Sequence, residues 1–263
     1  MPRFLSTLLL IPLLCAKLAG AETNDFDNSM GLHFKKVPGT SVLMCIWKCR
    51  VSDYNAFVSA TGRKCTKPPF VQTPNDPAVN ISWEDAKAFA YWLTGVEHAS
   101  GKLPADWFYR LPSDIEWSRA AGLSPSGEET GYAAEDNALY PWGKDWPPPP
   151  GCGNYSPSLQ VDKYPYTSPV GSFPANKLGF FDLGGNAWEW CEDTYNRSPD
   201  YRILRGASWR MKDPGDLLLS NRIGNVPDLQ LPVYGFRLVI EMPKPPEPPP
   251  LPTATTSSAI PKK

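Results

Sequence analysis

The sequence has little of what several common functions require. Its 263 residues include only two histidines, His33 and His98, and neither has another metal ligand nearby at metal spacing. A three-histidine metal site is therefore excluded. The formal net charge is −1, so no overall field attracts the chain to nucleic acid or to an anionic membrane. The main apolar run, residues 8–14, is far shorter than the roughly 20 residues of a membrane-spanning helix.

Glycine, proline and tryptophan are by contrast abundant, with 20, 31 and 10 residues. This composition predicts many turns, much irregular backbone and several aromatic anchors, and it argues against a helical bundle. A chain with so little regular hydrogen bonding needs other ways to fix its backbone. Bound calcium is one candidate, because it accepts about 6–8 oxygen ligands, backbone carbonyls included.

The first residues have the features of an export signal. Residues 1–21 begin with a positive charge at Arg3, continue through the apolar run and end in small residues, as cleaved leaders do. We therefore expect the mature protein to be secreted or periplasmic. Cys15 raises the alternative of a lipid anchor, but the bulky Leu14 before it disfavours such a site.

The last residues cannot build a core. Residues 242–263 are rich in proline, which favours an extended, solvated chain, so we expect a tail there. Without the leader and this tail about 220 residues remain, which suits a single domain.

Five cysteines lie outside the leader: Cys45, Cys49, Cys65, Cys152 and Cys191. Disulfides persist in the oxidising compartments that an exported chain reaches. Cys45 and Cys49 share one face of the strand-like run 42–51, and we expect a Cys49–Cys65 bridge. The odd count leaves at least one thiol unpaired, buried or reactive.

The first half of the chain predicts helices, and the second half does not. Ser52 precedes a helical pattern over 53–58, and Gly62 follows it as a stop signal. After Gly122 the helical period disappears. The closing run 234–240 is typical of a buried strand. We therefore predict an α+β domain with much irregular structure.

Two further helices begin with capping-box patterns. Ser82 precedes Asp85, and Ser113 precedes Glu116, each by three residues; in such a box the hydroxyl and the acid satisfy each other's free amides. Apolar positions follow both boxes at helical spacing: Ala86, Phe89, Ala90 and Leu93 after the first, Trp117 and Ala120 after the second.

A distinctive string, FDLGGNAWEW, occupies residues 181–190. It is followed in order by RGASW at 205–209, NR at 221–222 and GFR at 235–237. Together these motifs resemble the sulfatase-modifying factor family, that is, the formylglycine-generating enzyme superfamily. The resemblance implies that family's fold, a variant of the C-type lectin fold.

Earlier motifs agree with this resemblance, and they lie at residues 51–54, 79–86, 110–117 and 140–143. The similarity extends over residues 31–241, which we therefore expect to be one sulfatase-modifying-factor-like domain. Residues 22–30 are expected to link it to the leader.

The resemblance implies two calcium sites, which hard oxygen donors from short turns suit. The first would use Asn154, Tyr155, Asp162 and Tyr164. The second would use Asp182, Gly185, Ala187 and Glu189. The alternative is that these acids cap turns without a metal.

The family's founding activity converts a sulfatase cysteine to formylglycine with copper held by two thiolates, the soft ligands that Cu(I) requires. Those cysteines should follow the Gly-x-Ser-aromatic motif, but residues 209–222 contain none. Met211 and Asp216 lie near the expected positions, and neither replaces a thiolate. We therefore expect no copper and doubt the oxidase activity. Cys152 and Cys191 lie near the predicted calcium turns, but a disulfide explains that proximity better. Iron–histidine chemistry, known in a related branch, lacks its histidines.

The resemblance also points to Trp188, Ser208 and Arg222 as residues that line or support a substrate groove. Trp188 could stack on a peptide or sugar, and Arg222 could bind a carboxylate or sulfate. The alternative is that all three are structural.

Three functions follow from these observations. The first is a secreted, calcium-stabilised binding module without copper chemistry, whose partner is a protein, peptide or glycan. The second is a formylglycine-generating oxidase that acts through an atypical site. The third is lectin-like carbohydrate binding. None involves nucleic acid or a transmembrane segment.

Overall fold

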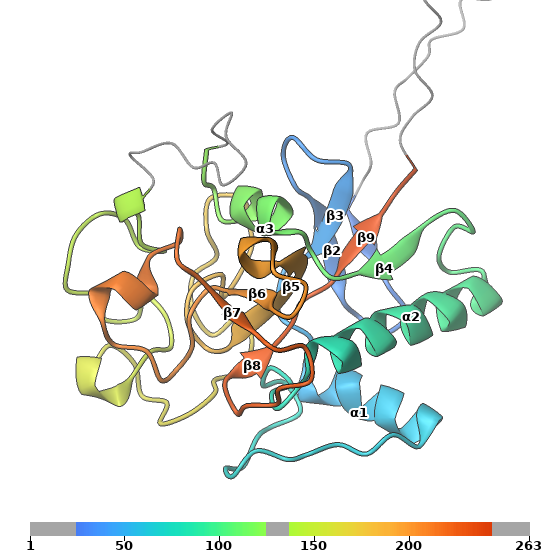
Figure 1. Ribbon diagram of the computed structural model, residues 1–263, viewed down its shortest axis with the longest axis horizontal. Helices are drawn as coiled ribbons and strands as arrows, with labels where there is room; N and C mark the ends of the chain where they lie inside the picture. Colours follow the sequence, from blue (N-terminus) through green and yellow to red (C-terminus); the bar gives the residue numbers. More distant parts are fainter. Residues whose placement is uncertain (1–24, 125–136, 244–263) are drawn as a thin grey trace, which may run out of the picture.

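The computed structural model describes residues 25–124 and 137–243. The expected leader, its Cys15 and the tail beyond residue 243 lie outside the described residues. The described part contains two sheets and three α-helices, joined by long irregular segments (Figure 1). The mixed α+β class expected from the sequence is therefore confirmed.

The first sheet is antiparallel throughout and joins strands from both ends of the domain. Its order is β1 (Phe26–Asp27), β2 (His33–Lys36), β3 (Val42–Cys45), β9 (Val239–Glu241) and β4 (Phe108–Arg110). Because β9 lies between β3 and β4, the C-terminal strand completes a sheet that the N-terminal strands begin.

The second sheet carries the distinctive sequence string. Its order is β7 (Arg222–Asn225), β6 (Arg202–Arg205), β5 (Trp188–Thr194) and β8 (Tyr234–Gly235). Strand β8 pairs with β5 in parallel, and the other pairs are antiparallel. Short 3-10 helices interrupt the connecting loops: η2 (Pro157–Leu159), η3 (Tyr195–Arg197) and η4 (Pro214–Leu217).

Helix α1 (Val51–Thr61) begins one residue before the predicted cap, Ser52. Arg50 takes the N-cap position, because the carboxylate of Asp53 reaches back to the Arg50 amide at 2.8 Å and to its guanidinium at 3.0 Å. The predicted stop is confirmed, since Gly62 ends the helix with a left-handed φ of 68°.

The other two helices confirm their predicted starts. Helix α2 (Trp83–Ser100) is capped by Ser82, and the four apolar positions predicted behind it are buried. Helix α3 (Asp114–Ala120) has both bonds of its capping box, from the Glu116 amide to Ser113 Oγ at 3.2 Å and from the Ser113 amide to Glu116 Oε2 at 2.8 Å. In Figure 1, α1 and α2 lie side by side below the first sheet.

Both predicted strands are shorter than expected. The run 42–51 is a strand only as far as Cys45. The run 234–240 is buried, as predicted, but it divides into β8 and β9, which belong to different sheets. The chain must cross between the sheets at Phe236–Leu238, where the side chain of Arg237 turns into the core.

Residues 25–30, expected to be a linker, pack onto the domain. Strand β1 pairs with β2, and the amide and hydroxyl of Ser29 donate to the buried carboxylate of Glu97 at 2.7 and 2.5 Å. Tyr109 donates to the same carboxylate at 2.6 Å. These bonds satisfy a buried charge, which would otherwise be costly.

The expected Cys49–Cys65 disulfide is not formed. All five cysteines of the described residues are free: Cys45, Cys49 and Cys191 are buried, Cys152 is half-buried and Cys65 is exposed. Cys49 is packed in the main apolar core, whereas Cys65 lies in the exposed loop after α1, so the two thiols are in different environments. No helix in the described part of the chain is long and apolar enough to cross a membrane.

Candidate functional site

The turn before β5 brings the predicted second site against the predicted first site. Asp182, Gly185 and Asn186 all have positive φ, of 54°, 80° and 63°. The Asn186 amide donates to the Asn154 carbonyl at 2.8 Å, and the Gly185 amide donates to the Gly206 carbonyl at 2.6 Å. Only glycine suits position 185, because a Cβ there would lie 2.4 Å from the Asn154 carbonyl oxygen.

A fully buried charge cluster lies behind this turn. The carboxylate of Glu189 on β5 accepts from Lys48 at 2.7 Å and from two nitrogens of Arg237 at 2.5 and 2.8 Å. Trp117 donates its indole N–H to the same carboxylate at 3.1 Å. The side chains of Lys48, Glu189 and Arg237 have 0% exposure. Each charge therefore depends on the others for solvation.

The electrostatics of this cluster follow from burial and pairing. Burial alone would raise the pKa of Glu189, but Arg237 and Lys48 hold that pKa below its ordinary value. Burial lowers the pKa of Lys48, and Glu189 opposes that shift. Lys48 lies in no motif that predicts a site, and Arg237 stands in the GFR motif without a predicted role, because neither has metal or catalytic spacing to other residues.

Lys48 makes a second bond, to the backbone carbonyl of Asp182. The Asp182 side chain faces elsewhere, and its Oδ2 accepts from the Gly171 amide at 2.8 Å. Burial raises the pKa of this carboxyl, with Lys48 acting in the opposite direction. Among the predicted ligands of the second site, Glu189 is thus bound to the Lys48 ammonium, whereas the Asp182 side chain is turned to the Gly171 amide.

The predicted first site is also brought together. Asp162 accepts from the Tyr155 amide at 3.1 Å and from the Tyr164 amide at 2.7 Å. Asn154, which is 1% exposed, donates to the Tyr166 carbonyl at 2.8 Å, while its own Oδ1 has no hydrogen-bond partner. A buried acceptor without a partner is unusual and calls for a missing ion or water.

The two sites therefore differ in how well they fit calcium. The first offers an orphaned amide oxygen, a carboxylate and nearby carbonyls, which are the hard oxygen donors that calcium prefers. The second does not fit, because Lys48 and Arg237 already neutralise Glu189. No group of three or more histidine, cysteine or acidic side chains that could hold a metal exists among residues 25–124 and 137–243.

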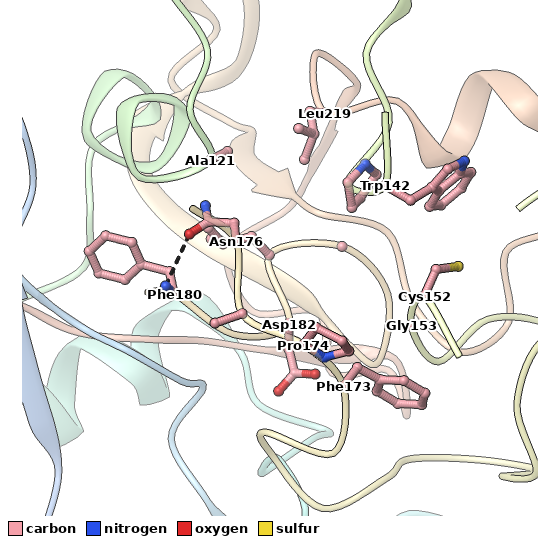
Figure 2. Close-up of a pocket in the computed structure, with 14 residues that line it drawn as sticks. Ala121, Trp142, Cys152, Gly153, Phe173, Pro174, Asn176, Phe180, Asp182 and Leu219 are labelled. Carbon is pink, nitrogen blue, oxygen red and sulfur yellow. Dashed lines mark hydrogen bonds between the residues drawn. The ribbon is translucent and has the colours of Figure 1, made fainter. Parts of the chain in front are cut away.

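A small cavity of about 190 Å³ opens beside the turn (Figure 2). The Asp182 carboxylate and the Cys152 thiol lie on its wall among mostly apolar neighbours. Asn176, which also lines it, uses its side chain internally, with Oδ1 accepting from the Phe180 amide at 3.1 Å and Nδ2 donating to the Ala120 carbonyl at 2.7 Å. Asn176 therefore has its side-chain amide engaged within the protein rather than offered to the cavity.

The three predicted groove residues are not gathered on an open surface. Trp188 is 2% exposed and belongs to the main apolar core, and Ser208 is fully buried. Arg222 is half-buried and pairs with Asp114 at 2.6 Å, a carboxylate that Arg205 also binds at 2.9 Å. This placement favours the structural alternative for all three.

Sequence reasoning missed an aromatic cluster that three distant segments form. Phe70 and Tyr166 stack with ring centroids 4.4 Å apart, and Trp209 packs edge-on against both at 5.6 and 5.2 Å. Tyr166 is 43% exposed. No sequence signal could have joined these residues, because their separation along the chain is too large for any local pattern.

The segment where the family places its copper ligands is without thiols. Met211 is half-buried and packs between two apolar clusters, and Asp216 lies in η4. Burial raises the pKa of Asp216, and Asp213 adds to the shift. A thioether and a carboxyl do not provide the two soft thiolates that Cu(I) needs.

The thiols elsewhere are poor nucleophiles. Burial raises the pKa of Cys45 to about 12 and that of Cys152 to about 11. It also raises the pKa values of Cys49 and Cys191 well above the ordinary value. Since the thiolate is the nucleophile and the metal ligand, none of these groups is activated at neutral pH.

We expect alkylation to reveal this order of reactivity. At about pH 7 iodoacetamide should label the exposed Cys65 first and Cys152 slowly, and the Cys152 rate should rise until the pH reaches about 11. Mass spectrometry of the labelled peptides measures each site, and the chain unfolded in guanidinium is the control. Rapid labelling of Cys152 at neutral pH would contradict the raised pKa of its thiol.

Comparison with known proteins shows a family match over most of the chain. A family described as "Sulfatase-modifying factor enzyme 1-like domain" matches residues 31–242. The chain is 32% identical over 186 residues to a Bos taurus protein named "Inactive C-alpha-formylglycine-generating enzyme 2", covering 65% of this chain and 52% of the relative. It is 30% identical over 201 residues to the formylglycine-generating enzyme of Thermomonospora curvata, covering 71% and 56%. The chain thus spans about half the length of these curated relatives.

Solved structures agree on the fold. PvdO from Pseudomonas aeruginosa superposes with a TM-score of 0.56 at 24% identity, covering 76% of this chain and 80% of that chain. CarF superposes with a TM-score of 0.55 at 22% identity, covering 84% and 97%. At these identities the likeness concerns the fold alone. It confirms the expected formylglycine-generating-enzyme-like variant of the C-type lectin fold.

Proposed function

The chain belongs to the sulfatase-modifying factor enzyme 1-like family, and on that premise we propose that it is a binding module that lacks the family's copper chemistry. One observation carries this proposal. Residues 209–222 hold Met211 and Asp216 where the family has its thiolate pair, and no cysteine lies among them. The remaining thiols are not activated, because burial raises their pKa values.

The relatives support the proposal. A protein whose name describes it as an inactive formylglycine-generating enzyme is among the most similar relatives. Others are named as formylglycine-generating enzymes, and one of them is similarly close. The named relatives thus include both kinds, and the absence of cysteine from residues 209–222 supports grouping this chain with the inactive kind.

We assign calcium, if bound, to the first site. Asn154 would supply its orphaned Oδ1, Asp162 a carboxylate oxygen, and Tyr155 and Tyr164 their carbonyls. Bound calcium there would fix two irregular loops, because it accepts backbone and side-chain oxygens together. Its role in this proposal is structural.

The aromatic cluster supports a binding role and favours a second candidate, lectin-like carbohydrate recognition. Tyr166 is 43% exposed and packs against the half-buried Trp209, the first residue of the 209–222 segment. Gln72 donates to the hydroxyl of the neighbouring Thr167 at 3.2 Å. Rings of this kind bury large apolar area against peptides or sugars. The export signal predicted at residues 1–21 would bring the chain to a secreted or periplasmic location, where such a partner would be met.

We expect the mature protein to bind no stoichiometric copper(I) and to leave a Cys-x-Pro-x-Arg peptide unchanged. The physical reason is the absence of two soft ligands in the 209–222 segment. Metal content after removal of excess copper(I), and mass spectrometry of the peptide, measure the two quantities. The Thermomonospora curvata enzyme serves as the positive control. Copper near one ion per chain, or peptide turnover, would overturn the proposal.

A further inference from the structure

The second predicted calcium site contains its own cation. We propose that the Lys48 ammonium permanently replaces the metal at this turn, so that residues 182–189 bind no calcium while Lys48 is present. The inference concerns a site separate from Asn154 and Asp162, and it does not depend on calcium being bound there.

The Lys48 ammonium occupies the position at Glu189 that a calcium ion would need. The Lys48 ammonium lies 2.7 Å from Glu189 Oε1 and donates to the Asp182 carbonyl. Calcium would need to approach its oxygen ligands to about 2.3–2.6 Å. An ion bound to Glu189 Oε1 would therefore collide with the ammonium, and the Asp182 side chain, the other predicted acidic ligand, is held by the Gly171 amide at 2.8 Å.

The acceptor positions of the Glu189 carboxylate are all in use. An ionised carboxylate offers about four lone-pair positions on its two oxygens. Glu189 receives four donors, of which one comes from Lys48, two from Arg237 and one from Trp117. No position is left over for a metal.

The charges of the buried cluster also disfavour a divalent ion. The side chains of Glu189 and Asp182 carry two negative charges when ionised, and Lys48 and Arg237 carry two positive ones. The cluster is therefore balanced without a metal. Adding a divalent ion would leave two uncompensated positive charges in a fully buried place, which is far more costly than a neutral arrangement.

The same reasoning predicts that removing Lys48 opens the site. In Lys48→Ala the buried groups carry one excess negative charge, and a space of side-chain size faces Glu189 Oε1 and the Asp182 carbonyl. Lys48→Met removes the charge but fills that space with an apolar chain. Only the alanine variant should therefore accept a cation.

The test is calcium content by mass spectrometry, after equilibration with calcium and removal of excess ion. Full-length chain is used, with folding checked by circular dichroism. We expect Lys48→Ala to hold about one calcium ion per chain more than wild type, and Lys48→Met to hold no more. The exposed Lys144→Ala is the matched control for the substitution itself.

Other outcomes are equally decisive. A folded Lys48→Ala that gains no calcium over Lys144→Ala overturns the inference. If Lys48→Ala does not fold, the calcium contents of wild type and Asp162→Ala are compared instead. Asp162→Ala lacks the carboxylate of the first site, so we expect it to hold no calcium. About one calcium ion per chain in Asp162→Ala would overturn the inference. A wild type without calcium, together with a gain in Lys48→Ala, rejects the first-site proposal and supports this one.

Discussion

Glu189→Gln should lower the free energy of unfolding by about 3–5 kcal/mol, the range for breaking a buried ion pair from one side. The amide keeps the shape of the side chain but leaves Lys48 and Arg237 without their counter-charge, at a place with no exposure. The N–H₂ group of the new glutamine would also face N–H donors that the carboxylate oxygen accepts from in wild type. Denaturant unfolding followed by fluorescence measures the change.

Glu192→Gln is the matched control, since Glu192 lies on the same strand and pairs with Lys87 at a partly exposed surface. We expect this change to cost no more than about 1 kcal/mol, as for exposed pairs generally. An equal decrease in the free energy of unfolding for Glu189→Gln and Glu192→Gln would contradict the prediction that the buried ion pairs contribute more to stability than the exposed one.

Gly185→Ala should destabilise the domain by about 2–4 kcal/mol, from backbone strain together with overpacking. The residue has a φ of 80°, and a Cβ there would lie 2.4 Å from a backbone oxygen, that of Asn154, and 3.0 Å from the Tyr155 ring. A backbone atom cannot move aside as a flexible side chain can. The turn would have to separate from the loop that carries the predicted first site.

Gly215→Ala is the matched control, because nothing lies within 4 Å of a Cβ at that position. We expect its stability to stay within about 0.5 kcal/mol of wild type. Thermal unfolding of the two variants measures the difference. A Gly185→Ala variant as stable as Gly215→Ala would refute the close packing of the two loops.

The helices could be predicted well because their signals are local. The Ser82 and Ser113 caps and the stop at Gly62 each depend on residues within one turn of the chain, where the sequence states both partners. The start of α1 was missed, because an arginine is a rare N-cap and only its bonds to Asp53 make it one. The run 234–240 reads as one strand, but its division between sheets depends on distant partners.

Some features of the candidate site could likewise be predicted from the sequence, and others could not. Motif order identified the family, and the absence of cysteine from residues 209–222 is the basis of the proposal that the copper chemistry is lacking, since both are properties of the linear chain. The Cys49–Cys65 bridge was wrong, because sequence proximity does not reveal that one thiol is buried and the other exposed.

The sequence by itself thus determined the Ser82 and Ser113 caps, the family and the absence of cysteine from residues 209–222. The tertiary structure alone decided what surrounds Glu189. Lys48 lies 141 residues before Glu189, and Arg237 lies 48 residues after it. Local patterns extend over a few residues, whereas the charge balance of a buried site is set by whatever the fold brings within about 3 Å.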